Sequence, residues 1–284
     1  MNTQPISSNR IEAVMKEVQE ELSPLLSRLD FEALAKHNRG YQRYAADPTS
    51  LFIKAEIHNH KKIIERLTQS LSANSRIMEI GFFIPMVPIA LAKLGFNVEA
   101  IEKLDFYGDA LNELIELASH KYGVVVHNMD VLGDDIEPLV NRYDWVVLSA
   151  ILEHLNGSPR DLLRRCRTLG KDDALFWISV PNAVSLYKRI LMFLKGIPPF
   201  PPIADYYGSA YPFTGHNREY TIGDLTFVIE QSGFDILSLE GHNRPLQTFH
   251  SLSQFLIDII SEIAPDSCKQ SLAAVARKRR GSTL

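Results

Sequence analysis

The chain has 284 residues, of which 45% are hydrophobic and 23% are charged, and its formal net charge is −4. This apolar content is sufficient for a packed core in one large domain or two small ones. The negative net charge argues against nucleic acid as a main partner, because binding to the phosphate backbone requires a basic surface.

Neither a membrane anchor nor a metal site is expected from the sequence. No run of residues approaches the roughly 18 consecutive apolar residues that a membrane-spanning helix needs. The N-terminal region is amphipathic and acidic, unlike a signal peptide, so a cytoplasmic location is expected. The two cysteines, Cys166 and Cys268, form neither a disulfide framework nor a metal-binding spacing.

The N-terminal quarter of the chain is predicted to be helical. Apolar residues recur at helical spacing within residues 11–70, which is typical of amphipathic helices. Pro24 is expected to interrupt the first of these helices. We interpret residues 1–70 as a helical extension and residues 71–284 as the main domain.

From residue 76 onward, apolar strands alternate with amphipathic helices. This alternation is typical of β-α-β units, which build a mostly parallel sheet with helices on both faces. The expected strands are residues 76–81, 96–102, 124–130, 143–150, 174–182, 235–241 and 271–278, and the expected helices are residues 86–95, 107–123, 159–170, 221–234 and 251–264.

Residues 182–220 break this alternation. The segment begins with a basic amphipathic stretch, residues 182–196, and continues with a stretch rich in proline and aromatic residues. A long irregular segment inside a compact domain is usually a lid or a binding loop. We interpret it as a lid-like cover of the active site. Peripheral contact with a membrane surface is the less favoured alternative for its basic helix.

Three successive predicted strands carry a carboxylate at or near their ends, namely Glu79, Glu102 and Asp130. Ligands of open parallel sheets bind beyond the carboxyl ends of the strands. Glu102 is placed to accept both hydroxyls of a ribose, and Asp130 to accept a hydrogen bond from an adenine amine. Glu79 favours a positively charged ligand. Each acid alone is an ordinary polar strand end, but together they favour a cationic nucleoside without phosphates.

Four segments resemble motifs of class I S-adenosylmethionine-dependent methyltransferases, in particular the small-molecule (type 11/12-like) branch. RIMEIGFFIPMVPIALAKLGFNVEAIE resembles the first two motifs, and YDWVVLSAILEHL resembles the fourth-strand motif. LLRRCRTLGKDDALFWISVPN resembles the helix and strand that follow, and GHNREYTIGDLTFVIEQSGFDI resembles the stretch that leads into the penultimate helix and strand. The resemblance covers about residues 70–278.

The resemblance implies an α/β, Rossmann-like fold: a seven-stranded, mostly parallel sheet whose last strand is antiparallel, with helices on both faces. It implies S-adenosyl-L-methionine as the cofactor and places the helical extension over the substrate side. The cofactor-binding residues expected from the strand ends and the resemblance are Glu79, Gly81, Phe83, Glu102, Met129, Asp130, Val131, Ser149 and Ala150.

The turn after the first strand departs from the family pattern. Where the family carries three alternating glycines, this chain has Gly81, Phe83 and Pro85. Glycine permits close backbone approach and positive φ, so Phe83 is expected to crowd or shift the methionine part of the cofactor. This departure favours one alternative, a binding or scaffold protein that kept the fold and lost the chemistry. A nucleotide-dependent oxidoreductase is a third hypothesis, against which the missing phosphate-binding glycines argue.

The expected function is transfer of a methyl group to a small molecule at oxygen. His154, with Glu153 beside it, is the candidate general base, although a structural role for His154 is the slightly favoured interpretation. Candidates for contact with the substrate are Tyr206, Tyr207, Tyr211 and His216. Packing within an irregular loop explains the three tyrosines almost as well.

Overall fold

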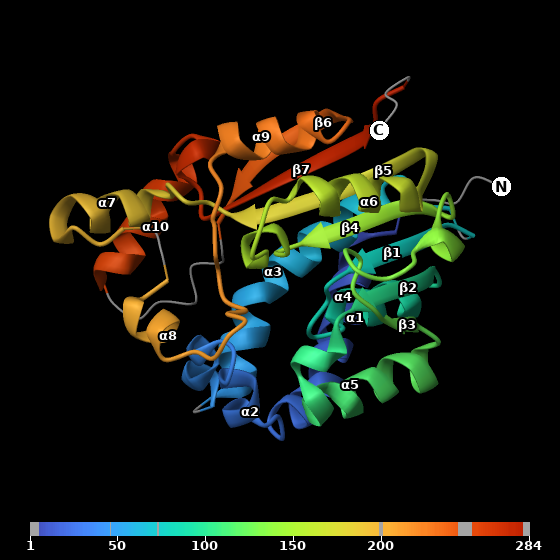
Figure 1. Ribbon diagram of the computed structural model, residues 1–284, viewed down its shortest axis with the longest axis horizontal. Coiled ribbons are helices and arrows are strands. Elements are labelled where there is room, and N and C mark those ends of the chain that lie inside the picture. Colours follow the sequence, from blue (N-terminus) through green and yellow to red (C-terminus); the bar gives the residue numbers. More distant parts are fainter. Residues whose placement is uncertain (1–5, 46, 73, 199–200, 244–251, 281–284) are drawn as a thin grey trace.

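The computed structural model describes residues 6–45, 47–72, 74–198, 201–243 and 252–280. Within them, seven strands form one sheet that runs through the centre of the molecule (Figure 1). The strands are β1 (Arg76–Ile80), β2 (Asn97–Glu102), β3 (Val125–Asn128), β4 (Tyr143–Ser149), β5 (Gly170–Pro181), β6 (Phe234–His242) and β7 (Ser271–Lys278).

The strand order is β3-β2-β1-β4-β5-β7-β6. Strands β1 to β5 run parallel to one another, whereas β7 lies antiparallel between β5 and β6. The predicted fold class, including the antiparallel last strand, is therefore confirmed. The order reverses between β1 and β4, and this reversal opens a crevice at the carboxyl ends of the strands.

The helices surround this sheet and join its strands. They are α1 (Ser8–Leu26), α2 (Phe31–Ala35), α3 (Pro48–Thr68), α4 (Met86–Lys93), α5 (Asn112–Glu116), α6 (Arg160–Leu169), α7 (Leu186–Lys195), α8 (Ile203–Tyr207), α9 (Ile222–Gln231) and α10 (Leu252–Ile263). Shorter turns of 3₁₀ or π helix are η1 (Arg39–Tyr44), η2 (Leu104–Phe106), η3 (Gly108–Leu111), η4 (Leu117–Lys121), η5 (Glu137–Leu139), η6 (Leu152–His154) and η7 (Asp266–Cys268).

Two sequence expectations about helices are corrected. α1 does not end at Pro24. The helix continues to Leu26, which is buried on the same apolar face as Leu22. The single helix expected over residues 107–123 is instead divided into η3, α5 and the π turn η4. This change of pitch leaves Leu111, Leu114 and Ala118 all buried in one core.

Each face of the sheet has its own apolar core. One core joins α1, α3 and α4 to β1 and β4, with Val18, Leu22, Ile64 and Trp145 among its members. The other joins α6 and α9 to the opposite face. Because the N-terminal helices share a core with the central strands, they pack as an integral layer of the sheet.

The shared core predicts that α1 and the sheet unfold together. Leu22→Ala is expected to lower the free energy of unfolding by about 2–5 kcal/mol, since Leu22 is fully buried. Urea unfolding followed by far-ultraviolet circular dichroism and by tryptophan fluorescence is expected to give one coincident transition. Glu20→Ala, an exposed change on the same helix, is the control, with an expected effect within about 0.5 kcal/mol. A separate early transition in Leu22→Ala would contradict the shared core.

Candidate functional site

A cavity of about 1080 Å³ lies at the carboxyl ends of the strands. Its size is that of a pocket for a small molecule or a cofactor, for which about 300–1,000 Å³ is usual. The ends of β1, β2, β4 and β5 form its floor, and residues of η1, α3, α7 and the segment before α9 form its other walls.

The cavity brings together most of the residues singled out in the sequence. All nine expected cofactor-binding residues contribute to its lining, and so do Glu153, His154 and His216. The three tyrosines expected to contact substrate do not belong to its described lining. Tyr206, Tyr207 and Tyr211 are 53%, 89% and 93% exposed, because α8 and the residues after it turn these rings toward solvent. Tyr206 packs edge-to-face on Phe213, which lines the cavity.

The turn after β1 requires glycine at its first position. Gly81 has a φ of +67°, and a Cβ atom added to it would lie 2.1 Å from Cδ1 of Ile151. Phe83 also has a positive φ, +46°, which is strained for a residue with a side chain. The turn therefore keeps a left-handed bend, although Phe83 stands at a position where the resemblance noted in the sequence implies glycine.

Phe83 forms part of an aromatic wall. Its ring packs against Tyr41 at a centroid distance of 5.3 Å and against Tyr107 at 5.1 Å. Its backbone N–H donates a hydrogen bond of 2.8 Å to Oε2 of Glu102. The turn after β1 and the end of β2 are thus joined through one carboxylate.

Glu102 is held in a fixed orientation. Besides the bond from Phe83, its Oε1 accepts a hydrogen bond of 2.9 Å from the N–H of Lys103, and the residue is almost fully buried. Burial raises the pKa of Glu102, and the two N–H donors counteract part of this effect. Each oxygen still has a lone pair for a further donor.

Asp130 lies after β3 beside a positive charge. Its Oδ2 accepts a hydrogen bond of 2.8 Å from Nζ of Lys103, and its Oδ1 accepts one of 2.8 Å from the N–H of Leu132. Burial works to raise the pKa of Asp130, but these donors outweigh it and leave the pKa below its usual value. Asp130 is therefore ionised at neutral pH.

Glu79, on β1, is buried without a charge partner among the described residues. Its Oε2 accepts no hydrogen bond from this part of the chain. Burial, followed by repulsion from Glu102, raises the pKa of Glu79 to about 8. A carboxyl group in this state is suited to a cationic ligand, which would favour its ionised form.

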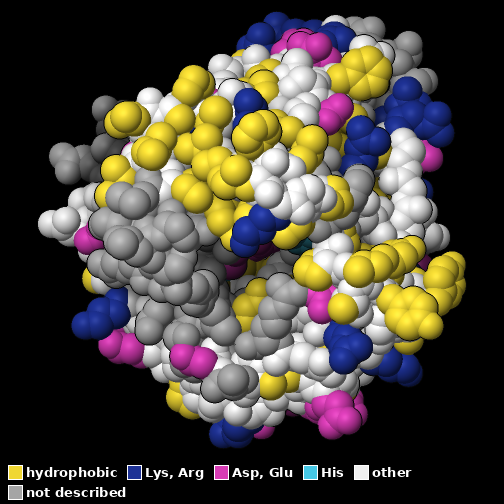
Figure 2. All heavy atoms as spheres, turned by 90° about the vertical axis from the view of Figure 1, so that its left-hand side faces the viewer, with side chains coloured by type: hydrophobic (Ala, Val, Ile, Leu, Met, Phe, Trp, Pro, Cys, Tyr) yellow, Lys and Arg dark blue, Asp and Glu magenta, His cyan; other side chains and the backbone are white. Residues whose placement is uncertain are grey.

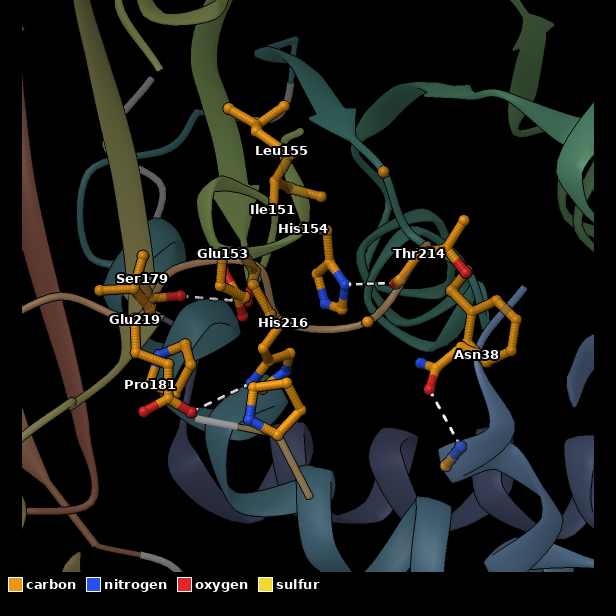
Figure 3. A pocket seen from close by; sticks show the side chains of 18 of the residues that line it. Asn38, Ile151, Glu153, His154, Leu155, Ser179, Pro181, Thr214, His216 and Glu219 are labelled. Atoms are coloured by element: carbon orange, nitrogen blue, oxygen red, sulfur yellow. Dashed lines mark hydrogen bonds and ion pairs between the residues drawn. The ribbon is translucent and has the colours of Figure 1, made fainter. Parts of the chain in front are cut away.

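A second polar group lies at the other side of the cavity, where Glu153 and His154 in η6 meet His216 (Figure 3). Nδ1 of His154 donates a hydrogen bond of 2.7 Å to the carbonyl oxygen of Thr214. The His154 and His216 rings meet edge-to-face at a centroid distance of 4.9 Å. Burial, and then the nearby charge of His216, lower the pKa of His154 to about 4. His154 is therefore neutral at physiological pH, with the lone pair on Nε2.

The sequence did not identify the contribution of α3 to the cavity. Glu56, Asn59 and His60 lie on one face of this helix and line the cavity opposite the strand ends. Their spacing of three and four residues is the only signal that marked them, and such spacing is common on solvated helix faces. Only the chain fold brings them to the site.

Apolar side chains gather on the surface formed by α7 and α10, beside a hollow in the molecule (Figure 2). On α7, Met192, Phe193 and Leu194 are exposed, and on α10, Ile259, Ile260 and Ile263 are exposed. Among the described helices, none has the length and apolar character needed to cross a bilayer.

Comparison with known proteins relates this geometry to a family. A family model described as a methyltransferase domain matches residues 52–239. A search of curated proteins finds no match.

Solved structures share this fold along nearly their whole length. A SAM dependent methyltransferase from Archaeoglobus fulgidus is 20% identical, with a TM-score of 0.51 over 81% of this chain and 97% of that one. The magnesium protoporphyrin IX methyltransferase from Synechocystis PCC 6803, solved with bound SAH, is 12% identical, with a TM-score of 0.55 over 93% and 99%. The 1,6-didemethyltoxoflavin-N1-methyltransferase of Burkholderia thailandensis is 14% identical, with a TM-score of 0.52 over 98% and 93%. At these identities the likeness shows the fold.

The buried Glu79 predicts a pH dependence of stability in the ligand-free protein. Its folded-state pKa of about 8 lies above the value of about 4.3 for an exposed glutamate. Between these two pKa values the folded state therefore binds more protons than the unfolded state. The free energy of unfolding falls over this range as the pH rises, and the fall ends above pH 8. We expect Glu79→Gln, which cannot ionise, to reduce the fall in unfolding free energy between pH 5 and 8 by up to about 1.4 kcal/mol per pH unit.

Urea unfolding at several pH values measures this slope. Glu116→Gln, a change of an exposed glutamate on α5, is the matched control and is expected to keep the slope of the unaltered protein. Glu153, whose pKa burial raises to about 7, retains part of the slope in both variants. An identical slope in Glu79→Gln and the unaltered protein would contradict the assignment.

Proposed function

This chain belongs to the methyltransferase domain family, and we propose that it transfers a methyl group from S-adenosylmethionine to an oxygen atom of a small molecule. The observation that supports this most is the row of acids Glu79, Glu102 and Asp130. They stand at the ends of β1 and β2 and just after β3, three adjacent strands, and line one cavity. A sulfonium nucleoside carries a positive charge at one end and hydrogen-bond donors along its ribose and adenine, which matches these acids.

In this proposal each acid has a separate task. Glu102 accepts hydrogen bonds from the ribose hydroxyls through the lone pairs that its bonds to the backbone leave open. Asp130 accepts from the adenine amine, with Met129 and Val131 beside the ring. Glu79 lies nearest the methionine end, where a positive charge converts an unfavourably buried carboxyl into a paired one.

The transfer itself is an in-line displacement on carbon. The carbon–sulfur bond of the sulfonium breaks, sulfur keeps the electron pair, and a lone pair of the acceptor oxygen forms the new bond to the methyl carbon. The protein aligns the two reactants and excludes water, and alignment alone can lower the barrier by about 7–11 kcal/mol. Nε2 of His154 accepts the proton of the acceptor hydroxyl.

The size and depth of the cavity favour a small acceptor. Tyr41 of η1, His60 of α3 and Leu191 of α7 line it together with the strand ends, so an acceptor beside the cofactor would have protein on several sides. The B. thailandensis structure, which has this fold, holds 1,6-didemethyltoxoflavin together with S-adenosylhomocysteine. The exposed apolar residues of α7 beside the cavity favour an acceptor with apolar parts.

A catalytically impaired binding protein is the second candidate. The specific observation in its favour is the turn after β1, where Phe83 and Pro85 replace two glycines and the Phe83 ring packs between Tyr41 and Tyr107. A protein of this kind binds S-adenosylmethionine without converting it to S-adenosylhomocysteine in the presence of any acceptor.

Isothermal titration calorimetry with S-adenosylmethionine tests the proposed cofactor site. We expect saturable binding at one site per chain. Glu102→Gln and Asp130→Ala should each weaken it by about 10- to 100-fold, because a hydrogen bond to a charged group contributes about 1.5–3 kcal/mol. Asp109→Ala, an exposed change on η3, is the control and should bind as the unaltered protein does.

Two outcomes would contradict the proposal. One is a folded protein that produces no heat at millimolar cofactor. The other is unchanged affinity in both acid variants, which would mean that the nucleoside binds elsewhere.

A further inference from the structure

Three metal-ligating side chains meet inside the cavity. A carboxylate oxygen of Glu153 and a ring nitrogen of each of His154 and His216 all lie within 4.8 Å of one another. Glu153 and His154 belong to η6 after β4, whereas His216 comes from the segment before α9, more than 60 residues later (Figure 3). No linear spacing in the sequence indicated this group.

Both imidazole rings are oriented by a partner on Nδ1. Nδ1 of His154 faces the carbonyl oxygen of Thr214 at 2.7 Å, and Nδ1 of His216 faces Oε1 of Glu219 at 3.1 Å. A carbonyl or carboxylate oxygen only accepts, so each Nδ1 carries the hydrogen, and Nε2 is the ring nitrogen left for a metal ion. Histidines that bind metals are oriented in this way by carbonyl or carboxylate oxygens.

The orienting carboxylate is itself fixed. Glu219 forms an ion pair with Lys188, whose Nζ also donates a hydrogen bond of 3.0 Å to the carbonyl oxygen of Asn182. The N–H of Asn217 donates to the carbonyl oxygen of Glu153 at 2.6 Å and joins the two segments that carry the ligating residues. The arrangement is therefore supported by the residue that follows β5, by α7 and by η6.

Glu153 is a second, independent indication that this group of side chains suits a cation. The residue is 0% exposed, and neither of its carboxylate oxygens accepts a hydrogen bond from the described part of the chain. A buried carboxylate without a partner is strongly unfavourable, whereas a cation held between it and two imidazoles would offset its charge.

We propose that Glu153, His154 and His216 bind one divalent transition-metal ion. Two imidazoles and one carboxylate suit zinc or the neighbouring first-row metals, whereas magnesium and calcium prefer sites made of oxygen atoms. Three protein ligands leave at least one coordination position open toward the cavity, as in catalytic rather than structural metal sites. Donors on one metal lie roughly 3–3.5 Å apart, so the group closes by less than about 2 Å on binding.

The ion would act on the acceptor, a role that rests on the proposed function, although the binding of the metal does not. The metal charge would lower the pKa of an acceptor hydroxyl at the open position, and the proton of that hydroxyl would pass to solvent. With metal bound, Nε2 of His154 would be a ligand and would no longer accept the proton. Transfer would form the bond between the methyl carbon and the acceptor oxygen as the carbon–sulfur bond breaks.

Titration of the chelator-treated full-length protein with Co²⁺, followed by visible absorption and calorimetry, tests the site. We expect one Co²⁺ per chain, with ligand-field bands that Zn²⁺ abolishes and excess Mg²⁺ leaves in place. His216→Asn, in a half-exposed loop, and Glu153→Gln should each weaken Co²⁺ binding at least tenfold. Glu219→Gln leaves all three ligating residues in place but alters the partner of His216 and of Lys188, and it should weaken Co²⁺ binding by about 10- to 100-fold.

His120→Asn is the matched control, because His120 is exposed on η4 and lies outside the cavity lining. It should bind Co²⁺ as the unaltered protein does, and circular dichroism should show that every variant is folded. The proposal is overturned if the folded protein gives no saturable Co²⁺ bands, or if His216→Asn and Glu153→Gln bind as tightly as the control. Cofactor binding measured without metal distinguishes this failure from failure of the proposed function.

Discussion

The cavity is dominated by the electrostatics of two carboxyl groups, Glu79 and Glu102, buried on adjacent strands. Parallel pairing of β1 with β2 puts both at one edge of the sheet, where the charge of Glu102 adds to burial in raising the pKa of Glu79. Backbone N–H groups compensate Glu102, whereas described residues leave Oε2 of Glu79 without a hydrogen bond. A positively charged ligand would compensate the negative charge of these carboxylates. Its binding also explains why acids stand at a position where burial disfavours their ionised form.

The backbone around these acids is constrained to keep the crevice open. A Cβ atom on Gly81 would force the side chain of Ile151 to move, and Gly81, Phe83 and Ala150 all hold positive φ values that residues with side chains seldom adopt. Strain of this kind persists only where the surrounding structure enforces it, and it clusters at functional sites. Here it lies at the switch between β1 and β4, where ligands of open α/β sheets bind. Phe83 thus adds an aromatic ring to the wall of the cavity, while the turn after β1 keeps its left-handed conformation.

Much of the fold, and the gathering of the strand-end acids in one cavity, was predictable from the sequence, because both depend on local patterns. Alternating apolar strands and helices gave the sheet, and acids at strand ends converge wherever parallel strands share an edge, as Glu79 and Glu102 do. The tyrosines of α8 were harder to place, since their exposure depends on the path of an irregular segment. The meeting of His216 with Glu153, like the approach of α3 to the cavity, is set by tertiary packing, and no spacing in the chain records it.

A crystal structure of the protein with S-adenosylmethionine tests the central claim most directly, which is that the acidic edge of the sheet holds a cationic nucleoside. The account predicts that the ribose hydroxyls lie on the Glu102 carboxylate, the adenine amine on Asp130 and the sulfonium end toward Glu79. Density for the nucleoside outside this edge, or the Phe83 ring occupying its place, would contradict it.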